Sequence, residues 1–132
     1  MNMGFNGKHT FRLKRLITSH RHALNGIRFA FQEPNFRFHT AAAIAVITAG
    51  ALLSLTATEW LIIFILVFGM LVLEMVNTAI EKTVDLVTED FHPLAKQAKD
   101  LAAGAVLVFA ILSAVTGSII FLPKLAALLS VF

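Results

Sequence analysis

Four polar side chains recur along one long apolar segment at the spacing of a helix face. They are Glu74, Asn77, Glu81 and Asp85. With about 100° of rotation per residue, all four fall within an arc of about 80° and rise about 16 Å along the helix axis. Carboxylates in such a row can accept a proton or, in a chain without cysteine, supply oxygen ligands to a hard cation such as Mg²⁺. Because Mg²⁺ also binds phosphate oxygens, the row predicts a site for a phosphate-bearing substrate.

The depth of Glu74 distinguishes it from an ordinary acidic residue. Glu74 is the one charged residue between Trp60 and Ile80. An ionised carboxylate against lipid costs several kcal/mol, so such a group pairs, binds metal, takes up a proton or faces a wet cavity. Two plainer interpretations stay open. Glu74 and Asn77 could have a purely structural role and join helices by hydrogen bonds. Asp85 could be a solvated or hydrogen-bonding acid at a helix end.

Further charged residues lie near the ends of the apolar segments. Lys99 and Asp100 precede the third segment, where the lysine could neutralise a nucleotide phosphate and the aspartate could accept a hydrogen bond from a sugar or base. The alternative is a basic membrane anchor beside a first-turn acid. Glu33 is the only acid before the first segment and by itself predicts a surface ion pair with Arg28 or Arg37. The sequence contains no glycine-rich nucleotide loop and no HExxH zinc motif.

Three apolar segments must position these residues. The chain has 132 residues, of which 58% are hydrophobic and 14% charged, too apolar for an ordinary soluble domain and too short for a large transporter. Residues 40–58, 60–80 and 101–122 can each cross a hydrocarbon core of about 30 Å as a helix. We therefore expect one all-α integral membrane domain over residues 1–132, with the second helix continuing to about residue 88.

Basic residues set the expected orientation. All of the 11 lysines and arginines except Lys124 precede residue 40 or lie between residues 81 and 100, which places the N-terminus and this connection in the cytoplasm. Residues 9–32 mix apolar and basic side chains at helical spacing and are followed by Pro34, so they predict an amphipathic helix on the cytoplasmic membrane surface. Nucleic-acid binding is disfavoured because these basic residues adjoin a membrane span.

Three blocks of the sequence resemble one known family. Residues 74–85 read EMVNTAIEKTVD, which resembles the ExxN[ST]AxExxVD signature of the prokaryotic diacylglycerol kinase and undecaprenol kinase family. The blocks HPLAK at 92–96 and AKDLAAGAV at 98–106 are similar to the second block of its Gram-positive branch. Upstream, EPNFRFH at 33–39 resembles the acidic residue and NFxxH segment of that branch.

The resemblance implies the fold, the assembly and the roles of the site residues. It implies a surface helix and three transmembrane helices in each subunit of a homotrimer, with active sites shared between subunits. Glu74 is then the general base for a lipid hydroxyl, Asn77 orients the site, and Asp85 supports it without touching substrate. Mg²⁺ would be held with ATP by Glu33 and Glu81, and the nucleotide would be contacted by Lys99 and Asp100, with Asp90 and His92 as further candidates.

The expected reaction is ATP- and Mg²⁺-dependent phosphorylation of a membrane lipid. The Gram-positive-like blocks favour undecaprenol as substrate, phosphorylated to undecaprenyl phosphate at the cytoplasmic membrane of a bacterium. The alternative is a diacylglycerol kinase that makes phosphatidic acid. The residues alone also leave open a small ion- or proton-conducting oligomer, but the first and third segments contain no ionisable residue with which to conduct across the membrane.

Overall fold

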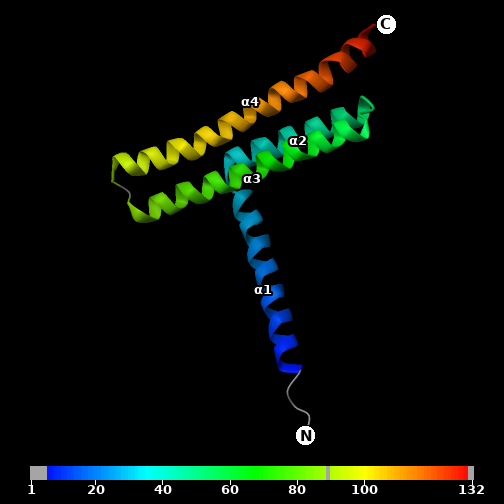
Figure 1. Ribbon diagram of the computed structural model, residues 1–132. Helices are drawn as coiled ribbons and strands as arrows, with labels where there is room; N and C mark the ends of the chain where they lie inside the picture. The colour runs from blue at the N-terminus through cyan, green and yellow to red at the C-terminus, as the bar shows by residue number, and fades with distance from the viewer. Residues whose placement is uncertain (1–5, 89, 131–132) are drawn as a thin grey trace.

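The protein is built from helices in the computed structural model, which describes residues 6–88 and 90–130 (Figure 1). The described residues form four helices, in the order α1 (Asn6–Ala30), α2 (Pro34–Leu52), α3 (Ala57–Val87) and α4 (Pro93–Leu129). The expected all-α fold is confirmed. Of the described helices, α3 and α4 are long enough and apolar enough to cross a membrane. The polar residues in the first turns of α2 lower its mean hydropathy, so α2 does not meet the same test.

Helices α2, α3 and α4 lie side by side, and α1 projects away from them (Figure 1). Helix α3 contacts each of the other three. The turn between α2 and α3 lies at the same end of the bundle as the C-terminus, and the α3–α4 connection lies at the opposite end, here called the hairpin end. Because α2 is much shorter than α3, it begins part of the way along the bundle, and the α3–α4 pair continues beyond it toward the hairpin end.

A short break between α1 and α2 turns the chain into the bundle. Pro34 occupies the first turn of α2, where its missing N–H costs nothing and its fixed φ suits a helix start. Ala30 and Phe36 are buried on either side of the break, and the rings of Phe31 and Phe36 meet edge to face at 5.0 Å between centroids. The expected helix over 9–32 therefore ends earlier, at Ala30.

The turn between α2 and α3 differs from the sequence-based expectation. Helix α2 ends at Leu52, not at residue 58, and Glu59 belongs to the first turn of α3, not to the connection. Thr56 caps α3: its hydroxyl accepts from the Glu59 N–H at 3.3 Å, and its own N–H donates to Glu59 Oε2 at 2.7 Å. Glu59 Oε2 also pairs with Lys124 Nζ at 3.0 Å, which ties α3 to α4. The S/T-x-x-E pattern of a capping box was the overlooked signal.

Helix α4 is longer at both ends than the expected 101–122 segment. It starts at Pro93, because His92 Nδ1 accepts from the Leu94 N–H at 3.2 Å and so caps the first turn. Residues 93–100 are too polar to count toward an apolar span, yet they continue the same helix. At the other end α4 continues through Pro123 to Leu129.

Packing between α3 and α4 includes one very close approach. A Cβ atom at Gly69 would lie 2.6 Å from Cζ of Phe109, so the phenyl ring fills the space that a side chain would need. Elsewhere few side chains are buried, and most large apolar side chains of α2, α3 and α4 face outward. Such a surface fits a hydrocarbon environment rather than water.

Candidate active site

The buried face of α3 changes from apolar to polar as it approaches the hairpin end. Ile63, Leu66 and Met70 are followed on the same face by Glu74 and Asn77, and all five are buried. Glu74 is only 3% exposed and Asn77 only 5%. The spacing of three and four residues along α3 explains why one stripe contains both the core and the candidate site.

Asn77 joins this buried stripe to the next acid along the helix. Its Nδ2 donates to Glu81 Oε1 at 2.9 Å. Its Oδ1 is buried and has no hydrogen-bond partner. A buried carbonyl oxygen without a partner is costly, so it marks a position where a donor or a cation from a ligand would be stabilised.

Glu33 reaches α3 from the break between α1 and α2. Glu33 Oε1 accepts a charged hydrogen bond from Lys82 Nζ at 2.8 Å. The surface pair with Arg28 or Arg37 that the sequence suggested is not the one observed. Local sequence reasoning could not find Lys82, because only the folded chain brings the break beside α3.

Two further ion pairs involve α4 at the hairpin end. Lys99 pairs with Asp85 and thereby links α4 to α3. Lys96 Nζ lies 2.5 Å from Asp100 Oδ2, one helical turn away, and both side chains are largely exposed. Lys99 and Asp100 therefore each have a partner within the chain, and Asp85 is an exposed acid near the end of α3 that also pairs with α4.

Asp90 and His92 make local contacts in the α3–α4 connection. The Asp90 N–H donates to Thr88 Oγ1 at 3.2 Å, while the His92 ring caps α4. Among the described residues, no hydrogen bond joins either of them to Glu74, Asn77 or Glu81.

An apolar groove leads along α3 toward Glu74. Its volume is about 600 Å³, and its floor includes Ile63, Leu66 and Met70 of α3. One wall comes from α2 and the other from α4, where Ala110 and Ala114 leave room. Glu74 lies one helical turn beyond Met70 on the same face and outside the lining of the groove. The volume and the apolar lining of the groove suit an alkyl chain.

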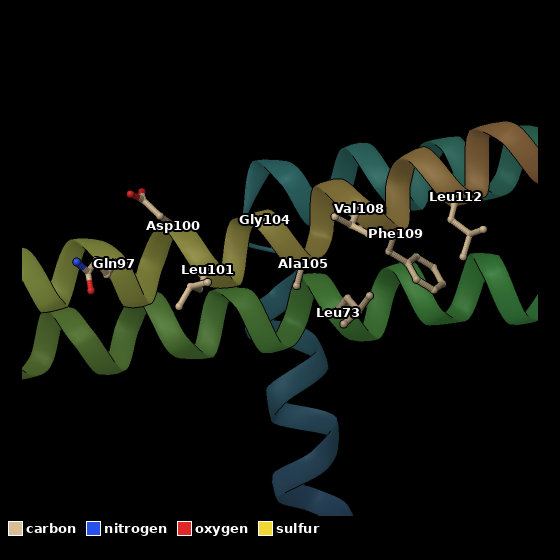
Figure 2. A pocket seen from close by; sticks show the side chains of 9 residues that line it. All are labelled: Leu73, Gln97, Asp100, Leu101, Gly104, Ala105, Val108, Phe109 and Leu112. Carbon is tan, nitrogen blue, oxygen red and sulfur yellow. The ribbon is translucent and has the colours of Figure 1, made fainter.

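A second hollow opens between α3 and α4 on another side, as Figure 2 shows. Its volume is about 870 Å³ and its wall is apolar from Leu101 to Leu112. Gln97 and Asp100 provide its polar end toward the hairpin, and Leu73 of α3 lies near the Phe109 ring (Figure 2). The hollow is shallow and open, and none of the buried polar residues lines it.

The donor atoms near Asn77 suit a hard cation. They are the Glu81 carboxylate, which accepts from the Asn77 amide, and the unpartnered amide oxygen of Asn77. The Glu33 carboxylate is paired with Lys82 of α3, the helix that also contains Glu81. Within the described part of the chain, no three His, Asp or Glu side chains are close enough to hold a metal ion by themselves. Carboxylate and amide oxygens are the kind of ligand that suits Mg²⁺, which commonly takes one or two carboxylates together with phosphate oxygens and waters.

The fold and site define an all-helical membrane protein with a buried carboxylate one helical turn from the floor of an apolar groove. The sequence model of prokaryotic diacylglycerol kinase matches residues 21–121. The chain is 56% identical over 118 residues to the undecaprenol kinase of Bacillus subtilis (strain 168), covering 89% of this chain and 96% of that protein. It is 44% identical over 116 residues to a Synechocystis diacylglycerol kinase, covering 86% of this chain and 66% of that protein. It is 28% identical over 107 residues to the diacylglycerol kinase of Escherichia coli (strain K12), covering 80% of this chain and 88% of that protein.

The chain therefore belongs to the prokaryotic diacylglycerol kinase family. The family resemblance of the sequence blocks is confirmed, and with it the assignment to the lipid kinases. The protein is a bacterial membrane protein of this enzyme family.

Proposed function

We propose that the chain is an ATP- and Mg²⁺-dependent kinase that phosphorylates the hydroxyl of undecaprenol to give undecaprenyl phosphate. The observation that carries this proposal is the apolar groove whose floor includes Met70, one helical turn from the buried Glu74 on the same face of α3. Undecaprenol is the favoured lipid because the identity to the undecaprenol kinase of Bacillus subtilis is 56% across nearly the whole of both chains.

Glu74 is the proposed general base. A polyprenyl chain lying in the groove brings its terminal hydroxyl to Glu74, which accepts the proton as the hydroxyl oxygen attacks the γ-phosphorus of ATP. The new P–O bond forms as the bond from the γ-phosphorus to the bridging oxygen breaks, and ADP leaves. Because phosphoryl transfer has a loose transition state, the main task of the enzyme is to align the two oxygens and to neutralise charge.

The nucleotide side of the site uses residues farther toward the hairpin end. Glu33 and Glu81 would hold Mg²⁺, with the free Oδ1 of Asn77 beside them. When bound, the metal ion neutralises phosphate charge during transfer. Asn77 keeps Glu81 in position through its amide.

The α3–α4 pair contributes the remaining nucleotide contacts. When the nucleotide binds, the Lys99 ammonium leaves Asp85 and pairs with a phosphate. When the nucleotide dissociates, Lys99 pairs with Asp85 again. Asp100 contacts the sugar or base. Asp90 and His92, in the connection beside them, complete this part of the site.

The proposed membrane position follows from where α1 leaves the bundle. In Figure 1 α1 departs from the side of the bundle at the start of α2, and its apolar residues, including Leu16, Ile17 and Leu24, are exposed. We place α1 on the cytoplasmic surface and α2 as a third span, so that the groove lies in lipid and the hairpin end reaches the cytosol. Residues 1–132 form one membrane domain in this arrangement, and Glu74 and Glu81 flank the interface.

The proposed assembly is a homotrimer with active sites shared between subunits. In one chain, the groove along α3 is open to the surroundings. The hollow between α3 and α4 is open as well (Figure 2). Ala41 and Ala45 of α2 are exposed and lie one turn apart, which permits close approach of a neighbouring helix.

One experiment tests the proposed function directly. Purified chain in one detergent preparation is given MgATP with undecaprenol or with diacylglycerol, and the phosphorylated lipids are measured in parallel. We expect faster formation of undecaprenyl phosphate. Faster formation of phosphatidic acid would replace the proposed substrate with diacylglycerol, in line with the name of the Synechocystis relative. Ion flux through liposomes without lipid phosphorylation would instead support the conducting oligomer.

A further inference from the structure

The ion pair between Glu33 and Lys82 differs from the other three in what it joins. Among the described residues, Asp85–Lys99 and Glu59–Lys124 join α3 to α4, and Lys96–Asp100 lies within α4. Only Glu33–Lys82 connects α3 to the break between α1 and α2. This pair therefore adds a charged contact to the apolar packing that holds α1 and the start of α2 against α3.

The Glu33 carboxylate serves this contact and not its own helix. Glu33 occupies the N-cap position of α2, where a side chain can satisfy free backbone N–H groups, yet it makes no such hydrogen bond. Its side chain is 30% exposed, whereas that of Lys82 is 64% exposed. The Glu33 side chain is therefore the more confined of the two, and the Lys82 side chain has more room to move away.

Several acidic residues lie on the turns of α3 around Lys82. Glu81 is adjacent to Lys82 in the sequence, and Glu74 lies farther along the same helix. Glu81 is held by the amide of Asn77, and Asp85 by Lys99. Lys82 is the group that neutralises Glu33, which would otherwise add an uncompensated negative charge to this acidic region.

We infer that Lys82 holds Glu33 against α3 while no metal ion is bound, and that it releases this carboxylate when Mg²⁺ enters with ATP. The inference rests on the proposed function, in which Glu33 is a metal ligand. A lysine ammonium on a flexible stem can take the place of a cation and turn away without moving its helix. Lys82 is thus a positioning residue that keeps the α1–α2 break closed on α3 in the nucleotide-free kinase, and it competes with the metal ion for Glu33.

A distance measurement tests the first half of this inference. The chain has no cysteine, so spin labels can be attached at two introduced cysteines, His22→Cys in α1 and Val87→Cys at the end of α3. Labelled chain is diluted with unlabelled chain in detergent, and the distance distribution is recorded with and without Mg²⁺ and a non-hydrolysable ATP analogue. Lys82→Met keeps the length of the stem and removes the charge, while Lys82→Arg keeps the charge.

We expect Lys82→Met to broaden the distribution in the empty chain and Mg²⁺ with the analogue to narrow it again. Lys82→Arg should resemble the parent in both states. Glu33→Gln should be broad in both states, because it loses the lysine and the metal ion alike. An empty-state distribution of Lys82→Met identical to that of the parent would overturn the inference.

Metal binding tests the second half. Mn²⁺ replaces Mg²⁺, and its binding in the presence of the ATP analogue is followed by the electron spin resonance of free Mn²⁺. Removing a competing exposed cation should lower the Mn²⁺ concentration for half-saturation by about threefold in Lys82→Met. An unchanged or raised value overturns the competition. Failure of the proposed function is recognised separately, because then the parent phosphorylates neither lipid and Glu33→Gln binds Mn²⁺ as the parent does.

Discussion

Asn77 donates its side-chain amide to Glu81 at 2.9 Å, while its own carbonyl oxygen is buried with no partner. The two halves of one carboxamide thus have different roles. The N–H orients an acid one turn away, and the oxygen is left without a donor. In the proposed mechanism Asn77 lies between the general base, Glu74, and the proposed metal ligand, Glu81.

Replacement of Asn77 by Ala should therefore reduce kcat, because Glu81 loses the donor that orients it. We expect a fall of about 10-fold to 100-fold, typical of a misplaced catalytic group. Thr83→Ala is the matched control, since the Thr83 hydroxyl only donates to the Ala79 carbonyl oxygen on an exposed face of the same helix. Steady-state rates of lipid phosphorylation measure both variants, and equal rates for Asn77→Ala and the parent would remove the orienting role.

Replacement of Glu74 by Gln should abolish most activity while leaving the fold intact. The change removes the proton acceptor at nearly constant shape, and loss of a general base typically costs about 10²-fold to 10⁴-fold in rate. Circular dichroism and gel filtration should match the parent, because an amide remains compatible with the buried position.

Glu59→Gln is the control for this substitution. Glu59 is also an acid of α3, but it lies at the opposite end, where it caps the helix and pairs with Lys124. We expect it to lower the melting temperature and to keep the turnover of the folded enzyme. A Glu74→Gln enzyme that turned over near the parent rate would show that another group takes the proton.

Replacement of Glu33 by Gln should shift the metal requirement. A neutral amide is a weaker ligand for Mg²⁺ than a carboxylate, so the Mg²⁺ concentration for half-maximal activity should rise by about 10-fold. Glu81→Gln should move it in the same direction. Titration of Mg²⁺ at constant ATP measures the shift, and curves that superimpose on that of the parent would discard both residues as metal ligands.

The periodicity of α3 was sufficient to predict which of its polar residues share a face. Glu74, Asn77 and Glu81 were found as one row because a helix repeats side-chain direction within a few residues. The burial of Glu74 and Asn77 follows, since the row continues the apolar stripe through Met70. Local rules thus located the buried part of the site.

Contacts between distant residues could not be predicted in the same way. The pair of Glu33 with Lys82 depends on how α1 and α2 meet α3, and the pair of Asp85 with Lys99 depends on the register of the α3–α4 hairpin. No short-range sequence pattern predicts either of these two ion pairs. The start of α3 is different, because Thr56 and Glu59 form a capping box that the sequence did contain.

A side chain at position 69 should destabilise the protein while residue 109 is phenylalanine. A methyl group there would lie 2.6 Å from Phe109 Cζ, so Gly69→Ala should force the ring to move and lower the free energy of unfolding by about 1–3 kcal/mol, as overpacking does. Phe109→Leu should recover part of this loss in the double variant. Gly26→Ala is the control, since open space surrounds Gly26 in α1. Unfolding in mixed detergent micelles is measured for the parent, both single variants, the double variant and Gly26→Ala. Equal losses for Gly69→Ala in the parent and in the Phe109→Leu background would contradict the contact.

Assembly should depend on the small residues along α2. Ala41 and Ala45 are exposed in the single chain and one turn apart, so a neighbouring subunit can approach the helix closely there. Ala45→Leu adds bulk at the point of approach and should shift the proposed homotrimer toward smaller species in crosslinking and gel filtration with light scattering. Ala51→Leu adds the same bulk at another exposed position of α2 and should leave the oligomer unchanged. Because the proposed active sites are shared between subunits, activity should fall together with the trimer fraction in Ala45→Leu. An unchanged oligomer profile for this variant would place the subunit interface on another face.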